Sequence, residues 1–251
     1  MQKKTIALLG FLLFATQAMA EDITNPFYMP LKGKMLSETS VVFVRDRFDD
    51  GRIRDTNENT FLTEKATVGV SDNFSMSLSL GNRFSASGSD ENVYWGAEAV
   101  FAPNFADHPE WLTQFGLAYR QERSHRDFDA FTRIGYLADM IFLPYVEARF
   151  SQPVNYGPDK NEAEVTVRAA GYSMISQTVG VRAGVEAVFN HEGTMRYESE
   201  GKRRRAFSLF GEADYAFNDT MAIGVTGGWI FHETGTDSTG YNIGATFKIA
   251  F

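Results

Sequence analysis

The end of the chain alternates between apolar residues and other residues without a break. From Tyr241 to Phe251 every second residue is apolar, and the last residue is aromatic. Because successive side chains of a β-strand point to opposite faces, this two-residue period predicts a strand with one apolar face. The intervening positions hold Asn242, Gly244, Thr246, Lys248 and Ala250.

A strand of this pattern that ends in Phe251 resembles the closing strand of Gram-negative outer-membrane β-barrels. The resemblance is to this broad porin-like class, and no specific family is matched. It implies an all-β fold, a transmembrane antiparallel up-and-down β-barrel, located in the cell outer membrane. It also implies that the barrel assembly machinery reads the C-terminal strand as an assembly signal.

The N-terminus has the parts of a secretory signal peptide. Lys3 and Lys4 precede an apolar run at 6–14, and Ala18 and Ala20 are small residues at the two positions that a signal peptidase reads. We therefore expect residues 1–20 to be removed after export. The alternative is a membrane anchor, which we disfavour because the run is well short of the ~20 apolar residues that span a bilayer.

The composition agrees with an exported membrane barrel. The chain has no cysteine, so disulfides, thiolate metal sites and a cysteine nucleophile are excluded. The mean hydropathy is −0.25 and no later segment approaches a transmembrane helix. Membrane barrels escape such an average because their strands alternate lipid-facing and lumen-facing residues. The formal net charge of −8 argues against nucleic acid as a partner.

Two further regions follow the signal peptide. Residues 21–35 contain Pro26 and Pro30 and are interpreted as an extended periplasmic N-terminal leader, because proline does not suit a central strand. We expect the leader to dock at the membrane rim; the alternative is that Phe27 and Tyr28 plug the barrel. Residues 36–251 repeat a strand and a turn, with short and long connections in alternation. This pattern predicts an outer-membrane β-barrel of about twelve strands with both termini in the periplasm.

The connections divide by length and polarity. Short turns are expected at 71–73, 138–141, 173–176 and 218–220, with 103–110 as a longer member of the same set. The more polar links are expected at 46–59, 87–91, 122–127, 152–161, 191–205 and 233–238. In outer-membrane barrels short turns are periplasmic and long loops face outward. Pro144 lies within the strand pair expected around residues 136–150, where a central strand does not favour it.

Apolar residues at alternate positions mark the lipid-facing wall. One such set is Phe74, Met76, Leu78, Leu80 and Phe84. Aromatic residues gather at the ends of these sets, as expected for the two girdles at the membrane interfaces. A soluble ligand-binding barrel would instead be apolar inside, and we disfavour it. In the strand at 61–70 the better lipid face includes Glu64, so either Glu64 lies near the outer rim or that register is wrong.

The opposite strand faces point into the lumen and carry both signs of charge. The pore-lining candidates are Lys65, Arg83, Glu98, Arg133, Glu147, Arg149, Glu164, Arg168, Arg182, Glu186, Glu212 and Lys248. In one interpretation, cross-strand neighbours such as Glu147 with Arg168, and Glu164 with Arg182, neutralise each other and fill the barrel. In the other, the arginines line a narrow aqueous path that attracts anions. The two interpretations are compatible.

One long loop ends in a basic run. Lys202, Arg203, Arg204 and Arg205 close the loop at 191–205. If this loop faces outward, its arginine forks suit the phosphates of lipopolysaccharide. The alternative is a solvated charge run that acidic residues of the same loop satisfy.

Catalytic chemistry has weak support. Some barrels of about this strand number are lipid hydrolases, and His232 with Asp237 and Ser238 is a sterically conceivable triad without a specific spacing. No metal-binding spacing or phosphate-binding glycine loop occurs, so no metal or cofactor is expected.

The sequence therefore favours a monomeric outer-membrane barrel that is not an enzyme. We expect a passive porin-like channel for small hydrophilic solutes, anions among them. In architecture it is similar to narrow twelve-stranded channels for acidic oligosaccharides, a likeness that no residue motif supports. The alternatives are a closed structural or surface-interaction barrel that acts through its loops and, third, a lipid hydrolase.

Overall fold

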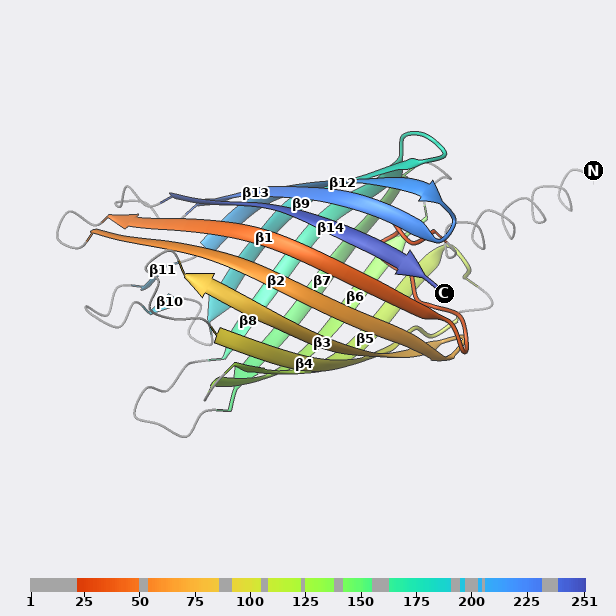
Figure 1. Ribbon diagram of the computed structural model, residues 1–251, viewed down its shortest axis with the longest axis horizontal. Coiled ribbons are helices and arrows are strands. Elements are labelled where there is room, and N and C mark those ends of the chain that lie inside the picture. The colour runs from red at the N-terminus through yellow and green to blue at the C-terminus, as the bar shows by residue number, and fades with distance from the viewer. Residues whose placement is uncertain are drawn as a thin grey trace, which may run out of the picture.

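The computed structural model shows a closed β-barrel (Figure 1). It describes residues 22–49, 54–85, 92–104, 108–122, 125–137, 142–154, 163–190, 195–196, 203–204, 206–231 and 239–251. Each strand of the wall pairs antiparallel with its two neighbours, and β1 pairs with β14 to close the barrel. The predicted fold class is confirmed, including the strand number.

Twelve strands form the described wall. In chain order they are β1 (Met35–Asp49), β2 (Arg54–Ser71), β3 (Phe74–Ser85), β4 (Asn92–Phe101), β5 (Trp111–Glu122), β6 (His125–Tyr136), β7 (Phe142–Pro153), β8 (Glu164–Met174), β9 (Val179–Asn190), β12 (Ala206–Asn218), β13 (Met221–Phe231) and β14 (Thr239–Ala250). The two-residue strands β10 (Met195–Arg196) and β11 (Arg203–Arg204) pair with each other outside the wall. None of the residues described forms a helix long and apolar enough to cross a membrane.

The barrel has a short-turn end and a long-loop end. Residues 72–73 and 219–220 form tight turns at the short-turn end, where the C-terminus also lies (Figure 1). The strand β14 pairs with β1 from Leu36↔Ala250 to Arg47↔Thr239, so the terminal strand completes the wall. Because every strand of a closed barrel has two partners, no edge is left for pairing with another chain.

Two long connections are shorter than the sequence indicated. Residues 46–59 were expected to form one polar link, but β1 and β2 pair as far as Asp49↔Arg54. Residues 122–127 were expected to form another, but β5 and β6 pair as far as Glu122↔His125. These expectations were wrong because apolar alternation marks only the part of a strand that faces lipid. A hairpin that extends into water keeps its backbone pairing without that pattern.

The strand pair that contains Pro144 is present. Pairing of β7 with β6 ends at Gly135↔Tyr145, one residue before the proline is reached. On its other side Pro144 lies opposite Gly171 of β8. Because the pairing with β6 has already ended at Pro144, the proline interrupts fewer strand pairings than it would in the middle of the wall.

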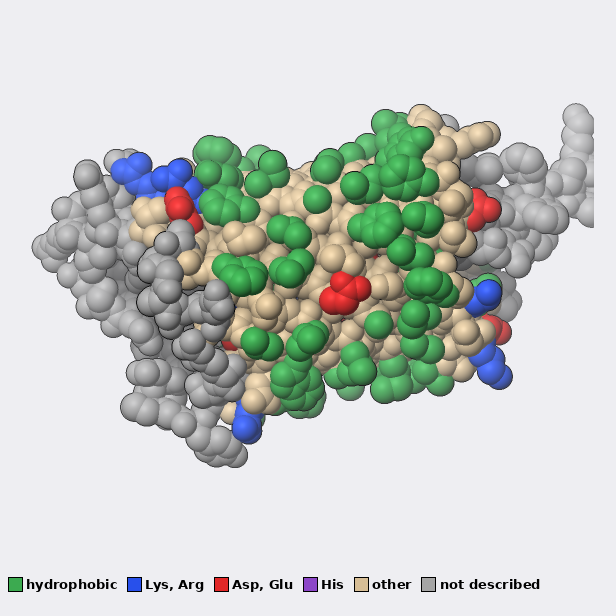
Figure 2. Space-filling model, viewed as in Figure 1, with side chains coloured by type: hydrophobic (Ala, Val, Ile, Leu, Met, Phe, Trp, Pro, Cys, Tyr) green, Lys and Arg blue, Asp and Glu red, His purple; other side chains and the backbone are tan. Residues whose placement is uncertain are grey.

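The outer surface of the wall is apolar, as predicted. Large hydrophobic side chains such as Leu78, Val93 and Leu117 are about 60% exposed. Figure 2 shows hydrophobic side chains distributed along the visible wall between its two ends. Aromatic pairs lie near both ends, among them Trp95–Tyr119 and Trp111–Tyr136. This is the surface that a barrel presents to lipid, with an aromatic girdle at each interface.

Glu64 faces outward from the middle of the apolar wall, so the register at 61–70 is as the sequence predicted. It lies opposite Leu80 of β3 and Thr39 of β1. Figure 2 shows acidic colour amid the hydrophobic side chains on this part of the wall. The carboxylate accepts hydrogen bonds from Ser37 Oγ at 2.9 Å and Thr39 Oγ1 at 2.5 Å. Glu64 therefore does not lie at the outer rim; two neighbouring hydroxyls partly satisfy it instead.

Candidate functional site

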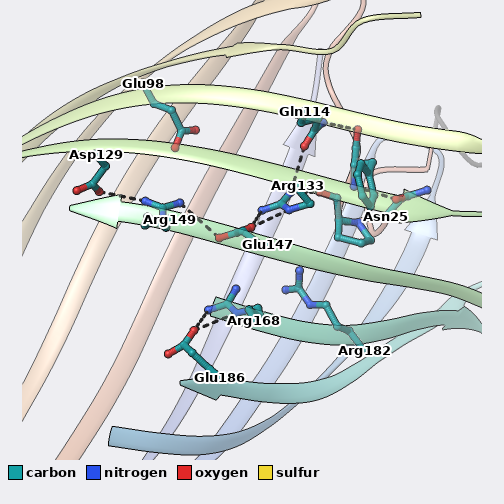
Figure 3. A network of polar contacts seen from close by, with 12 residues as sticks. Asn25, Glu98, Gln114, Asp129, Arg133, Glu147, Arg149, Arg168, Arg182 and Glu186 are labelled. Atoms are coloured by element: carbon teal, nitrogen blue, oxygen red, sulfur yellow. Dashed lines mark hydrogen bonds and ion pairs between the residues drawn. The ribbon is translucent and has the colours of Figure 1, made fainter. Parts of the chain in front are cut away.

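The inward faces of the strands carry a row of alternating charges. Arg133, Glu147, Arg168 and Glu186 follow one another on β6 to β9 as direct cross-strand neighbours. The distance from Arg133 Nε to Glu147 Oε2 is 2.8 Å, and that from Arg168 Nε to Glu186 Oε2 is 3.0 Å. In Figure 3 dashed lines join Arg133 to Glu147 and Arg168 to Glu186. Antiparallel register brings them together, because residues opposite each other share a face.

Further ion pairs continue around the lumen. Arg149 Nη1 lies 3.1 Å from Asp129 Oδ2 and its Nη2 lies 3.8 Å from Glu147 Oε1. The other pairs are Arg182–Glu212, Lys248–Asp214 at 3.3 Å, Lys65–Glu98 at 2.8 Å and Arg83–Glu122 at 2.8 Å. Most of these ion pairs link side chains of different strands across the inner face of the wall. They also neutralise most of the fixed charge in the lumen.

The Arg133–Glu147 pair is the most buried of the charged row, with side chains 18% and 7% exposed, and only the Lys248–Asp214 pair, at 10% and 5%, is more buried among the pairs named here. Two arginines also lie over aromatic rings: Arg149 is 4.9 Å from the centre of Phe131, and Arg168 is 4.9 Å from that of Phe210. Such stacking fixes the plane of a guanidinium and adds a favourable cation–π interaction. The arginine side chains are therefore held in place by both charge and packing.

The structure places every pore-lining candidate on a lumen-facing strand position, but it does not bring together every predicted pair. Glu147 and Arg168 are cross-strand neighbours, as predicted, but the ion pairs are Glu147 with Arg133 and Arg168 with Glu186. The predicted pairing of Glu164 with Arg182 is wrong. Glu164 is the first residue of β8, at the long-loop end, and lies opposite Asn190, whereas Arg182 lies opposite Tyr172 and Glu212. Sequence periodicity assigns a face, but only the register assigns a level along the barrel.

Residues 22–30, which we call the N-terminal segment, lie inside the barrel at the short-turn end. Ile23, Thr24 and Asn25 are about 5% exposed, and Phe27 is 9% exposed. Phe27 packs with Leu137, Leu143, Tyr145 and Tyr172 in a small hydrophobic cluster in the lumen. Docking at the rim was therefore the wrong expectation. The alternative, in which Phe27 and Tyr28 enter the barrel, agrees with the observed position, because Phe27 packs in the lumen and Tyr28 lines its cavity.

Side chains of the wall hold the backbone of the N-terminal segment. Gln114 Nε2 donates to the Phe27 carbonyl at 2.9 Å, and Arg133 Nη1 donates to the Pro26 carbonyl. The Phe27 ring meets Tyr145 edge to face at 5.8 Å, and Arg133 lies over the same ring at 5.7 Å. Arg133 thus belongs both to the charged row and to the contact with the segment.

A second contact lies at the start of the N-terminal segment. The Tyr172 hydroxyl is 2.7 Å from Asp22 Oδ2 and 2.6 Å from Thr24 Oγ1. The segment also turns on itself, because Asn25 N donates to the Asp22 carbonyl at 2.9 Å and Tyr28 N to the Asn25 carbonyl at 3.0 Å. These two backbone hydrogen bonds lie within the segment itself.

Three glycines of the wall make room for the chain that enters the lumen. A Cβ on Gly135 would lie 2.7 Å from Phe27 Cζ, and one on Gly180 would lie 2.8 Å from Thr24 Oγ1. A Cβ on Gly69 would lie 2.1 Å from the Leu31 carbonyl oxygen. The sequence shows these glycines only as small residues on inward faces. Their role becomes clear only when the strand register places each glycine beside the chain that enters the lumen.

A polar cavity of about 360 Å³ remains between the N-terminal segment and the charged side chains. Its wall includes five cationic and three anionic side chains: Lys65, Arg133, Arg149, Arg182, Lys248, Glu38, Glu98 and Glu212. Glu38 was not among the candidates, although it lies between Lys248 and Lys65 in the strand register. A cavity of this composition accommodates water and small polar solutes.

The other candidate sites gain no support from the described part of the chain. Among residues with described placement, no group of three His, Asp or Glu side chains is arranged to hold a metal ion. His108 is exposed in a turn, where its ring lies 3.2 Å from Glu110. His232, Asp237 and Ser238 lie outside the described residues, as do Lys202 and Arg205. Arg203 and Arg204 form β11, and their side chains are likewise outside the description.

Comparisons with known proteins identify the fold. No family model and no curated protein sequence matches the chain. Among solved structures, the COG4313 outer membrane channel from Pseudomonas putida F1 is similar, with a TM-score of 0.65, 10% identity and coverage of 89% of this chain and 97% of that one. The NanC porin has a TM-score of 0.60 at 11% identity, covering 83% and 98%. The NalP autotransporter translocator domain from Neisseria meningitidis has 0.61 at 10%, covering 98% and 97%. The chain therefore has the fold of outer-membrane β-barrels.

Proposed function

We propose that this chain is an outer-membrane channel that conducts small hydrophilic solutes through a narrow charged lumen. The observation that carries the proposal is the polar cavity of about 360 Å³, lined by charged side chains of both signs, inside a wall that is apolar outside. Water-filled interiors of membrane barrels have this distribution of polarity. The likeness in fold to channels and porins agrees with it.

The ion pairs bear on which solutes pass. Arg182 is held by Glu212, and Arg168 by Glu186. Because each cation lies beside a carboxylate, the lumen does not present a continuous positive track, and we expect only a weak preference for anions. Mixed charge suits solutes that bear hydroxyl, amide or zwitterionic groups, which exchange hydrogen bonds with both signs.

Single-channel recording in a planar bilayer tests this proposal. Arg182→Ala leaves the Glu212 carboxylate without its cation, so the cation-to-anion permeability ratio is expected to rise several-fold. Arg168→Ala is expected to shift the ratio in the same direction. Arg45→Ala is the matched control, because Arg45 pairs with Glu58 on the outer face of the wall and is expected to leave the ratio unchanged. Equal ratios in all four proteins would contradict a conduction path along the lumen arginines.

The remaining expectations about setting and partners belong to the same proposal. The short-turn end faces the periplasm and the long-loop end the exterior, as in other barrels of this kind. The barrel is monomeric, contacts outer-membrane lipid and lipopolysaccharide, and is inserted by the barrel assembly machinery through the strand that ends in Phe251. No nucleic acid partner and no catalysis are part of the proposal. A closed structural barrel would conduct no ions in the same recording. A lipid hydrolase would hydrolyse lipid and would lose that activity in the variant His232→Ala.

A further inference from the structure

We propose that the N-terminal segment is a displaceable plug that regulates the channel by closing the short-turn mouth of the barrel. The inference rests on the proposed channel function, since a plug has meaning only for a path that can open. It is carried by three features of the segment: where it lies, how it is attached, and which side chain it shares with the charged row.

The chain at 22–34 crosses the full width of the lumen. Lys32 forms a bridge with Gly69 of β2, whereas Asp22 and Thr24 contact Tyr172 of β8. In the wall, β2 and β8 are separated by five strands in either direction, so they face each other across the barrel. Between them Gln114 and Arg133 contact Pro26 and Phe27. A solute that leaves the cavity through this end meets the segment.

The N-terminal segment is attached in a way that lets it leave without opening the wall. At 32–34 the backbone is fixed, because Gly33 N donates to the Gly69 carbonyl at 2.8 Å and Gly69 N to the Lys34 carbonyl at 3.0 Å. Before that point the contacts with the wall come from side chains, while each wall strand keeps both neighbours. Gly33 has a φ of 77°, which only glycine adopts without strain. The fixed point at 32–34 is therefore suited to act as a hinge.

Arg133 couples the N-terminal segment to the solute path. Its Nη1 donates to the Pro26 carbonyl and lies 3.2 Å from Gln114 Oε1, while its Nε is bound to Glu147. Arg133 and Gln114 also line the cavity. An acceptor oxygen of a solute in the cavity competes with the Pro26 carbonyl for Arg133 Nη1 and with the Phe27 carbonyl for Gln114 Nε2. Occupancy of the cavity is thus expected to weaken the hold on the segment.

An engineered disulfide tests the plug directly, because the chain has no cysteine of its own. A Cβ on Gly180 lies 2.8 Å from Thr24 Oγ1, so Thr24→Cys with Gly180→Cys brings two sulfurs within bonding reach, where Cβ atoms are ~3.5–4.5 Å apart. The same Cβ also lies 2.8 Å from the Tyr172 hydroxyl, so the Tyr172 side chain must move to make room for it. Each single variant is therefore recorded as a control for that displacement.

The measurement is single-channel conductance of the refolded full chain under oxidising and then reducing conditions. We expect the oxidised double variant to conduct several-fold less than the same protein after reduction, and the single variants not to respond to the reductant. A second variant that lacks residues 22–30 is expected to show a larger and steadier conductance than the wild-type chain. It does not depend on disulfide formation.

The outcomes separate the plug from the channel. If the plugless and wild-type proteins conduct equally, and oxidation changes nothing once formation of the disulfide is verified, the plug is wrong and the channel stands. If every form is silent while its heat-modified gel mobility shows a folded barrel, the channel itself is wrong and the plug with it. A reversible block in the oxidised double variant alone supports the proposal.

Discussion

At the scale of single residues, Glu64 is the side chain that departs most from the rule of an apolar outer wall. It is exposed on the lipid-facing side of β2, where its carboxylate accepts hydrogen bonds from Ser37 and Thr39. These bonds replace part of the hydration that a carboxylate loses in hydrocarbon. They do not replace all of it, because hydroxyl donors are neutral and no cation is recorded beside this group in the described structure.

Replacing Glu64 by leucine is therefore expected to stabilise the barrel in a bilayer. The free energy of unfolding should rise by about 1 kcal/mol, the lower range for a charge on a lipid-facing strand. Urea titration of the protein refolded into vesicles of a thin lipid bilayer measures this free energy of unfolding. Leu80→Glu is the matched control, because Leu80 lies directly opposite Glu64 and the reverse change is expected to destabilise. A loss of stability in Glu64→Leu would show that the carboxylate has a favourable partner at this face.

At the scale of elements, ion pairs of the charged row join β6 to β7 and β8 to β9 in addition to the backbone hydrogen bonds. The row arises because Arg133, Glu147, Arg168 and Glu186 occupy the same level of four successive strands. A slip of one residue in any of these strands would turn its charges toward lipid. The row therefore adds specificity of register, which backbone pairing alone does not provide.

Breaking the most buried pair of the row tests its contribution. Glu147→Leu leaves the Arg133 guanidinium without its main acceptor and is expected to lower the free energy of unfolding by about 3 kcal/mol. The double variant Arg133→Leu with Glu147→Leu is expected to recover part of that loss, because it removes the orphaned charge. Unfolding titrations of the two single variants and the double variant measure the coupling. Strictly additive losses would indicate that the pair contributes no interaction of its own.

At the scale of the whole molecule, the seam between β1 and β14 decides whether the chain is a barrel or an open sheet. The seam extends to the last residue, where Phe251 N donates to the Met35 carbonyl at 2.8 Å and Met35 N to the Phe251 carbonyl at 3.2 Å. The Phe251 side chain itself is 59% exposed. Its backbone thus closes the wall while its ring remains available on the outer surface.

Because the backbone of Phe251 closes the wall while its ring is exposed, removing the ring is expected to affect assembly in cells but not the stability of the folded barrel. Phe251→Ala is expected to keep the free energy of unfolding of the refolded protein within about 0.5 kcal/mol of the wild-type value, because an exposed ring is removed. In cells the yield of folded barrel is expected to fall several-fold, since we propose that the barrel assembly machinery recognises the terminal aromatic residue. Phe101→Ala is the control, since Phe101 is 44% exposed at the same end of the barrel and ends an internal strand. Equal cellular yields from the two variants would contradict a special role for Phe251.

The sequence by itself determined the class of fold, the two faces of most strands and many of the charged side chains on the inward faces, although it missed Glu38. Successive side chains of a strand alternate between the two faces, so counting positions assigns each side chain to a face. The lipid-facing positions are apolar, which shows which face is outside. Even Glu64 lies on the outward face that the alternation in its strand predicts. Where strands leave the bilayer this apolar pattern ends, which is why the extensions of β1 and β2 to Asp49 and Arg54 gave no signal.

Only the tertiary structure decided what lies at the same level of the barrel. Levels depend on the register between paired strands, and a sequence pattern with a period of two restricts that register only to shifts by an even number of residues. Hence Glu164 and Arg182 were placed together wrongly, and Arg133 was not connected with Pro26. The entry of Phe27 into the lumen was decided in the same way, because its space is left by Gly135. That space exists only after the wall has closed.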